Sequence, residues 1–127
     1  MSLRTPPPLL TALVLHIAKV YKLLYVLGNK LSKRDKLGIH RTIEKTTLRI
    51  LSQTLHATFA HGIQKIAALE TLRIDIEALK LLIRTEHELR IISEKTYFIL
   101  SHHCIEASKM TNGWLKSLKN KTPHRVF

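Results

Sequence analysis

The chain contains a single cysteine, Cys104, among its 127 residues. One cysteine excludes an intrachain disulfide bond and a zinc site built from several cysteines. No uncharged run approaches the ~18 apolar residues that a membrane-spanning helix needs. The first residues are interrupted by Pro6–Pro8 and lack the layout of a secretory signal. We therefore expect a cytoplasmic protein that does not enter a membrane.

Signatures of catalysis and of ligand binding are also missing. The sequence has no GxGxxG, no Walker loop and no HExxH. His102 and His103 are adjacent, so they point in different directions on a helix, and no cysteine or acid completes a ligand set with them. Cys104 falls on an apolar helical seam and is interpreted as a small core residue. The sequence thus predicts no enzymatic activity, no metal and no cofactor.

Acidic residues are scarce. The chain has 21 Lys and Arg but only nine Asp and Glu, for a formal net charge of +12. Residues 1–65 carry 11 basic and two acidic residues, residues 66–108 carry five and seven, and residues 109–127 carry five and none. This excess predicts an anionic partner, which can be RNA, DNA or an anionic membrane surface. The alternative is that two solvated basic ends flank an ordinary helical domain.

Apolar residues make up 45% of the chain and recur at intervals of three and four, and no segment has the alternation of a β-strand. The spacing predicts four helices, over about 8–27, 32–60, 63–91 (or 69–91) and 94–119, with Ser32 and Ser93 as N-caps. We expect an all-α fold, an antiparallel up-down-up-down four-helix bundle. The bundle should span residues 9–119, between an N-terminal tail (1–8) and a basic C-terminal tail (120–127).

The first predicted helix carries more apolar surface than a single seam requires. Its seam consists of Leu10, Leu13, Ile17, Val20, Leu24, Leu27 and Leu31. Leu23, Val26 and Tyr25 lie outside this seam. The surplus surface indicates either a subunit interface or a central, well-buried helix in a monomer.

The second predicted helix has two faces. Ile43, Ile50, Leu51 and Leu55, with Leu48 beside them, should face the core. Arg34, Arg41, Lys45, Arg49 and His56 follow steps of seven, four, four and seven, which places them on one side of the helix. This basic row has few acids near it, and phosphate binding needs charge density more than precise geometry. Thr42, Thr46 and Thr47 are candidate hydrogen-bond donors to phosphate.

A second basic set lies at the end of the fourth predicted helix. In an up-down-up-down bundle the start of the second helix and the end of the fourth lie at opposite ends, so one continuous patch needs a long nucleic acid or several subunits. The candidate nucleic-acid-binding residues are Arg34, Arg41, Lys45, Arg49, Lys116, Lys119 and Lys121.

The third predicted helix has a seam of Leu69, Leu72, Ile76, Leu79 and Ile83, and its polar face mixes both charges. Three ion pairs are expected there, Glu70–Arg73, Glu77–Lys80 and Glu86–Arg90. In the fourth helix, Gly113 beside Trp114 indicates close helix packing or a bend.

Two spacings resemble a nuclease signature. Arg34-x5-His40 and Arg49-x6-His56 are similar to the Arg-x4–6-His motif of HEPN ribonucleases, in which Arg and His flank a scissile phosphate. Such spacings arise easily in a chain that is rich in cations and histidines.

Longer stretches resemble another family. The segments LSKRDKLG (31–38) and IEKTTLRIL (43–51) look like helix 2 of the four-helix proteins encoded in ribosomal-RNA intervening sequences. They are closer to the relatives of those proteins, the accessory variability determinant (Avd) proteins of diversity-generating retroelements. Segments 79–89, 92–97 and 106–118 agree, and Gly113–Lys116 is the most specific piece. Ser32 and Asn112 depart from the usual pattern, which has proline and glycine there.

This resemblance implies a homopentameric, barrel-like assembly with a positive surface and no catalysis of its own. It implies a nucleic-acid-binding accessory subunit that binds the reverse transcriptase and the template RNA of the retroelement and supports mutagenic cDNA synthesis. Three alternatives remain: an oligomer of the ribosomal-RNA intervening-sequence type, an oligomer with an acidic protein partner, and a HEPN-like ribonuclease.

Overall fold

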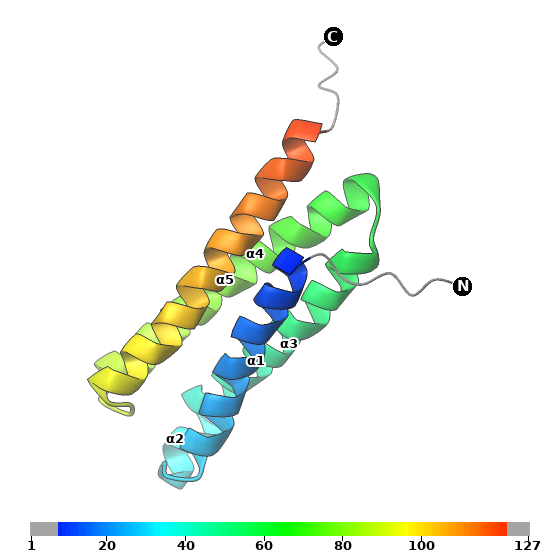
Figure 1. The fold of residues 1–127 in the computed structure, drawn as a ribbon. Helices are drawn as coiled ribbons and strands as arrows, with labels where there is room; N and C mark the ends of the chain where they lie inside the picture. Colours follow the sequence, from blue (N-terminus) through cyan, green and yellow to red (C-terminus); the bar gives the residue numbers. More distant parts are fainter. Residues whose placement is uncertain (1–7, 122–127) are drawn as a thin grey trace.

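The computed structural model describes the backbone of residues 8–121 and the side chains of residues 12–120. Its helices are α1 (Pro8–Gly28), α2 (Lys33–Leu37), α3 (Ile39–Phe59), α4 (Gly62–Glu88) and α5 (Glu94–Lys121). The four long helices lie side by side and alternate in direction, while the short α2 sits at one end (Figure 1). Helix α3 packs on α1 and α4, and α5 packs on α4 and α1. The predicted all-α four-helix bundle is confirmed.

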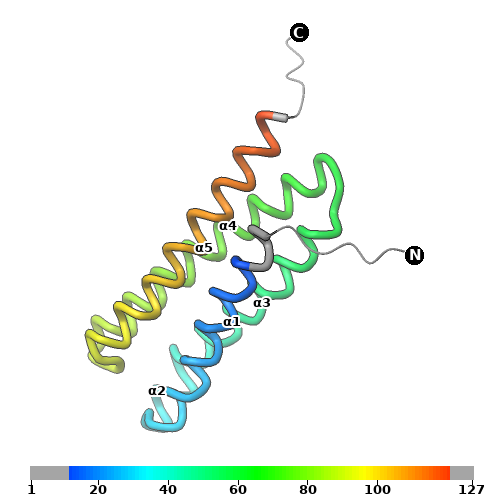
Figure 2. Tube along the Cα trace, viewed as in Figure 1, coloured from blue at the N-terminus to red at the C-terminus, as the bar shows by residue number. Residues whose placement is uncertain are grey.

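The bundle has two distinct ends. Helix α2 and the turn between α4 and α5 lie at one end, here called the α2 end, and the turn between α3 and α4 lies at the other, the α5 end, together with the last turn of α5 (Figure 2). None of the described helices is long and apolar enough to cross a membrane.

Three of the predicted seams form the core. The fully buried residues include Leu13, Ile17, Val20 and Leu24 of α1, Leu69, Leu72, Ile76 and Leu79 of α4, and Leu100, Cys104 and Ala107 of α5. Leu10 lies outside the described side chains. Burial raises the pKa of the Cys104 thiol to about 12, so Cys104 is a neutral core residue, as predicted.

The buried stripe of α3 differs from the prediction. Leu48 and Leu55 are 45% and 59% exposed, so their assignment to the core is wrong. The stripe instead consists of His40, Ile43, Thr46, Thr47, Ile50, Thr54 and Ala57. Polar residues can lie there because their hydrogen bonds are satisfied. Thr47 Oγ1 donates to the Ile43 carbonyl and Thr54 Oγ1 to the Ile50 carbonyl, each at 2.8 Å.

The predicted continuous helix over 32–60 is interrupted at Gly38, which separates α2 from α3. Ser32 caps α2 as predicted, because its Oγ accepts a hydrogen bond from the Asp35 backbone at 3.2 Å. The Gly38 N–H donates to the Arg34 carbonyl at 2.9 Å. A Cβ at residue 38 would lie 2.8 Å from the Arg34 carbonyl oxygen. Glycine therefore allows the close turn between the two helices.

Helix α4 ends at Glu88, three residues before the predicted end. The Arg90 N–H donates to the His87 carbonyl and the Ile91 N–H to the Glu86 carbonyl, at 2.9 and 3.1 Å. This is the Schellman pattern, with Arg90 in the left-handed conformation (φ 61°) that glycine usually adopts. The predicted Glu86–Arg90 ion pair is wrong, because Glu86 is fully buried. The pairs Glu70–Arg73 and Glu77–Lys80 are confirmed.

Ser93 caps α5 as predicted, because the Thr96 N–H donates to its Oγ at 3.1 Å. The expected close packing at Gly113 is wrong: Gly113 is exposed, and a Cβ added there would have no atom within 4 Å.

We predict that Gly38→Ala destabilises the protein by about 1–3 kcal/mol, because the added methyl group overlaps a backbone oxygen that cannot move independently. The matched control is Gly113→Ala, which should stabilise the protein by about 0.5–1 kcal/mol, since alanine is favoured over glycine within a helix and the space is open. Urea unfolding followed by circular dichroism measures both changes. Equal effects of the two substitutions would contradict the role of Gly38.

Candidate nucleic-acid interface

The exposed face of α3 carries most of the predicted basic row. Arg41, Lys45 and Arg49 are exposed and spaced four residues apart, so they form one line along the helix. Arg34 is exposed on α2, beyond the start of α3. The cations of this row therefore lie between the α2 end and the middle of the bundle.

The charges in this row differ in how far they are neutralised. Arg49 Nε donates to Asp75 Oδ2 of α4 at 3.2 Å. No carboxylate among residues 12–120 lies within ion-pair distance of Arg34, Arg41 or Lys45. A phosphate can approach these three cations without displacing a protein carboxylate, so they are the strongest candidates for phosphate contacts.

The same face of α3 also carries exposed apolar side chains. Leu48, Leu55 and Phe59 are 45%, 59% and 72% exposed. The face is therefore cationic near α2 and increasingly apolar toward the end of α3, where His56 is also exposed. We call the exposed residues from Arg41 to Phe59 the α3 outer face. A partner of this face would contact both charged and apolar groups.

The predicted threonine donors are only partly available. Thr46 and Thr47 are 4% and 0% exposed, so they cannot reach a phosphate, and this part of the prediction is wrong. They were misplaced because they belong to the buried stripe of α3. Thr42 is exposed and lies beside Arg41 on the α3 outer face.

The second basic set lies on α5. Lys119 Nζ donates to Glu70 Oε1 at 2.7 Å. Hydrogen bonds from Lys119 and Arg73 hold the pKa of the Glu70 carboxyl below its usual range. Lys116 is exposed, and no described carboxylate pairs with it. Lys121 is the last residue of α5, and its side chain lies outside the described side chains.

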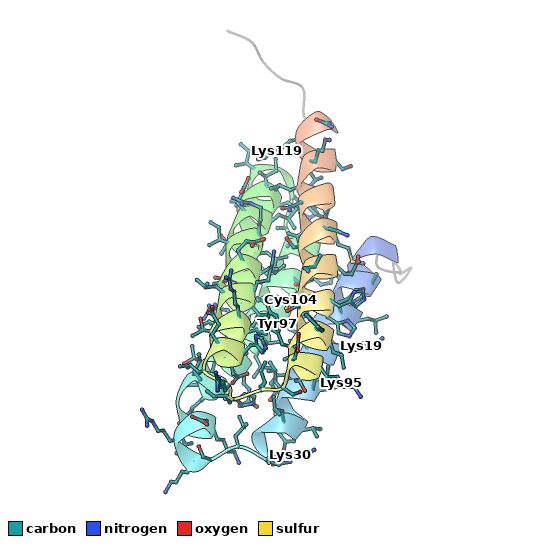
Figure 3. The ribbon with its side chains drawn as sticks, turned by 90° about the vertical axis from the view of Figure 1, so that its left-hand side faces the viewer. Lys19, Lys30, Lys95, Tyr97, Cys104 and Lys119 are labelled. Carbon is teal, nitrogen blue, oxygen red and sulfur yellow. The ribbon has the colours of Figure 1, made fainter. Side chains whose placement is uncertain are left out.

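The two basic sets do not merge within one chain. Lys30, which precedes α2, and Lys119 lie at opposite ends of the molecule (Figure 3). This separation agrees with the sequence-based expectation that one continuous patch needs a long nucleic acid or several subunits.

A buried polar network lies beneath the cationic part of α3. His40 and Glu86 are both 0% exposed, and His40 Nδ1 lies 2.9 Å from Glu86 Oε2. His40 Nε2 lies 2.7 Å from the Leu24 carbonyl oxygen. A carbonyl oxygen only accepts, so Nε2 carries the proton and donates to it. The network joins α1, α3 and α4.

The pKa of His40 is raised above its ordinary value. Burial alone would lower it, but the hydrogen bonds to Glu86 and Leu24, together with the negative charges of Glu86 and Glu44, outweigh burial. The raised pKa favours the imidazolium form of His40, in which both ring nitrogens donate. This arrangement removes His40 from any contact with a phosphate, so the Arg34-x5-His40 spacing cannot form a ribonuclease site.

Histidines also meet between α1 and α5. His16 Nδ1 and His103 Nδ1 lie 2.9 Å apart, and the ring of His102 lies near both. Burial and the neighbouring positive groups His16, His102 and Lys19 lower the pKa of His103. Within residues 12–120, no group of three or more His, Cys, Asp or Glu side chains is arranged to hold a metal ion.

Comparison with protein-family models, with curated proteins and with solved structures finds no match to this chain.

We predict that Glu86→Gln destabilises the protein by about 3 kcal/mol near pH 6, because it leaves a buried imidazolium without its carboxylate. Because the pKa of His40 is raised in the folded state, its contribution to the free energy of unfolding is complete below pH 6.5. This contribution is lost as the pH rises through the folded-state pKa. The difference in unfolding free energy between the unsubstituted protein and Glu86→Gln should therefore shrink as the pH rises.

The measurement is urea unfolding of both proteins at several pH values between 5.5 and 9. The difference in unfolding free energy between the two proteins is the useful quantity, because the lowered pKa of His103 adds a separate pH dependence below pH 6.5 that both proteins share. A deficit that is independent of pH would contradict the charged His40–Glu86 pair.

Proposed function

We propose that the protein is a non-enzymatic, nucleic-acid-binding accessory subunit of a diversity-generating retroelement. In this role it binds the template RNA and the reverse transcriptase and supports mutagenic cDNA synthesis. The nucleic-acid part rests on three exposed cations that have no carboxylate partner among residues 12–120, namely Arg34, Arg41 and Lys45. The retroelement part is supported by the resemblance of residues 31–51 and 79–118 to the Avd family.

The mixed chemistry of the α3 outer face fits two partners at once. Cations near α2 suit the phosphates of an RNA, whose backbone dominates affinity. The exposed Leu55 and Phe59, toward the other end of α3, suit a protein surface, because interface cores are enriched in apolar and aromatic side chains. We assign this apolar part to the reverse transcriptase.

Assembly into a homopentamer is also part of the proposal. Tyr25 and Val26 of α1 are 62% and 59% exposed in the single chain. The interpretation of the surplus surface as that of a central, well-buried helix in a monomer does not hold for these residues, and this apolar surface is available to contact another copy. Several copies would place cations from separate chains along one RNA.

The closest alternative is an oligomer of the ribosomal-RNA intervening-sequence type, with a structural or general nucleic-acid-binding role. It shares the fold and the cations and differs in lacking the polymerase partner. The HEPN-like ribonuclease is disfavoured by the burial of His40. Its second pair, Arg49 and His56, is exposed, but the guanidinium of Arg49 is bound to Asp75.

We predict that the double substitution Arg41→Gln and Lys45→Gln weakens binding to single-stranded RNA. It should also reduce the slope of log affinity against log salt by about 0.7 for each lost phosphate contact. Fluorescence anisotropy with a labelled RNA over a series of salt concentrations measures both effects.

The matched control is Arg84→Gln with Lys109→Gln, which removes the same charge from two exposed residues that each have a nearby glutamate. An equal loss of affinity in both variants would indicate a response to net charge alone. Unchanged affinity in the α3 variant would rule out this site.

The retroelement role predicts a particular gene neighbourhood. A reverse-transcriptase reading frame should lie beside the gene, with two near-identical repeats that differ mainly at template adenines, and the polymerase should copurify with the protein. A location within a ribosomal-RNA gene, or no neighbouring polymerase, would favour the intervening-sequence alternative.

A further inference from the structure

A cavity of about 470 Å³ lies at the α2 end, between the α2–α3 junction and the turn that follows α4. Arg34, Gly38 and Ile39 line it from one side, and Leu89, Arg90 and Ile91 from the other. We call it the α2–α4 cavity. Its volume is within the range of about 300–1,000 Å³ that is typical of small-ligand sites.

The two charged walls of the cavity are arginines from different elements. Both Arg34 and Arg90 are exposed, and neither has an ion pair with a carboxylate among residues 12–120. Asp35 is the carboxylate that lines the cavity, so the positive charges outnumber the negative one. Two arginines that line one space suit a phosphate, because a guanidinium group binds phosphate oxygens through paired hydrogen bonds.

The backbone conformation of Arg90 favours glycine, which indicates that the arginine side chain has a role besides forming the turn. Arg90 is the only non-glycine residue with positive φ in residues 8–121. Glycine adopts this conformation at a helix C-terminus without strain, whereas arginine does not. Because Glu86 is bound to His40 inside the bundle, the guanidinium of Arg90 is not bound by that carboxylate and can reach the cavity.

The remaining walls are apolar. Ile39 and Ile91 are half-buried, and Leu89 is 60% exposed. Gly38 has no side chain to fill the space. A flat apolar group lying over these residues would remove Leu89 from water, which is favourable. A nucleotide combines such a group, its base, with a phosphate.

We propose that the α2–α4 cavity binds one nucleotide of a single-stranded RNA, with the phosphate between Arg34 and Arg90 and the base against Ile39, Leu89 and Ile91. The inference rests on the proposed function, because it names where that RNA is held. Arg34 lines the cavity and also belongs to the basic row with Arg41 and Lys45, so the RNA can continue from the cavity toward the α3 outer face. Asp35 can accept a hydrogen bond from a base amino group, which makes adenosine monophosphate (AMP) the suitable probe.

The experiment is a titration of the full chain with AMP, with adenosine and with inorganic phosphate, followed by the amide resonances of Gly38 and Arg90 in NMR spectra. AMP should saturate these shifts, and each fragment should bind at least tenfold more weakly. Arg34→Gln and Arg90→Gly should each weaken AMP binding at least tenfold. Arg84→Gln, which removes an exposed arginine of α4 that lies outside the cavity, should leave AMP binding unchanged.

Arg90→Gly separates the proposed role from a structural one. If Arg90 serves only the turn, glycine should raise the thermal midpoint by a few degrees and leave AMP and RNA binding as they were. We expect the same rise in the midpoint together with the loss of AMP binding and weaker RNA binding. Retained AMP affinity in Arg90→Gly would overturn the proposal.

The remaining outcomes are also decisive. No saturable AMP shift in the unsubstituted chain overturns the nucleotide cavity, and so does equal binding of inorganic phosphate and AMP. Failure of the cavity is distinguishable from failure of the proposed function. If RNA binding depends on Arg41 and Lys45 but not on Arg90, the proposed function stands and the nucleotide cavity is overturned. If the protein binds AMP but not RNA, the cavity stands and the proposed function is overturned.

Discussion

One buried polar contact, between His40 and Glu86, joins helices of the bundle at the α2 end. Both side chains are removed from water, and a buried ionisable pair is costly unless the two partners compensate each other. His40 satisfies its second nitrogen at the carbonyl of Leu24, so three helices are fixed to one another at a single level of the bundle. Sliding of one helix past another would break these hydrogen bonds, whereas an apolar layer has no such directional contacts. The network therefore determines where α3 begins relative to the end of α4.

That register positions the charges on the surface. With His40 inside, Arg41 and Lys45 must face outward, and with Glu86 inside, it no longer neutralises Arg90. The lysines and arginines around α2 make this end cationic, and the burial of Glu86 removes one carboxylate that could have neutralised Arg90. On the middle of α4 the acids remain outside, where Glu70 and Glu77 bind neighbouring cations and leave little free charge. The contrast between the two regions is consistent with RNA lying near α2.

Periodicity predicted the helices and three of the four core seams, because Leu13–Leu24 and Leu69–Ile83 are apolar at every third or fourth position. Periodicity failed on α3 because three residues at the buried positions, His40, Thr47 and Thr54, are polar. The hydrophobic Leu48 and Leu55 were assigned to the core instead, although they lie outside the buried stripe. His40 lies three residues before Ile43, and Glu86 lies three residues after Ile83. The helical interval alone would therefore have placed both ionisable groups in the core. Their direct contact then follows from the antiparallel pairing of α3 and α4.

Other features were outside the reach of sequence reasoning. The break at Gly38 depends on a short distance between a backbone oxygen and the position that a Cβ would occupy, and this distance is not recorded in the sequence. The cations of the basic row were identified correctly as exposed, but the neutralisation of Arg49 by Asp75 and of Lys119 by Glu70 joins residues from different helices. The α2–α4 cavity joins residues more than fifty positions apart, which no local motif records.

The left-handed conformation of Arg90 also has an evolutionary meaning. At this position most random substitutions are unfavourable, while a change to glycine improves the turn. Drift without selection would therefore carry the position toward glycine. A cation that persists here in one lineage after another would be a record of selection for its charge, and lineages that have abandoned the ligand would be recognisable by the glycine that replaced it.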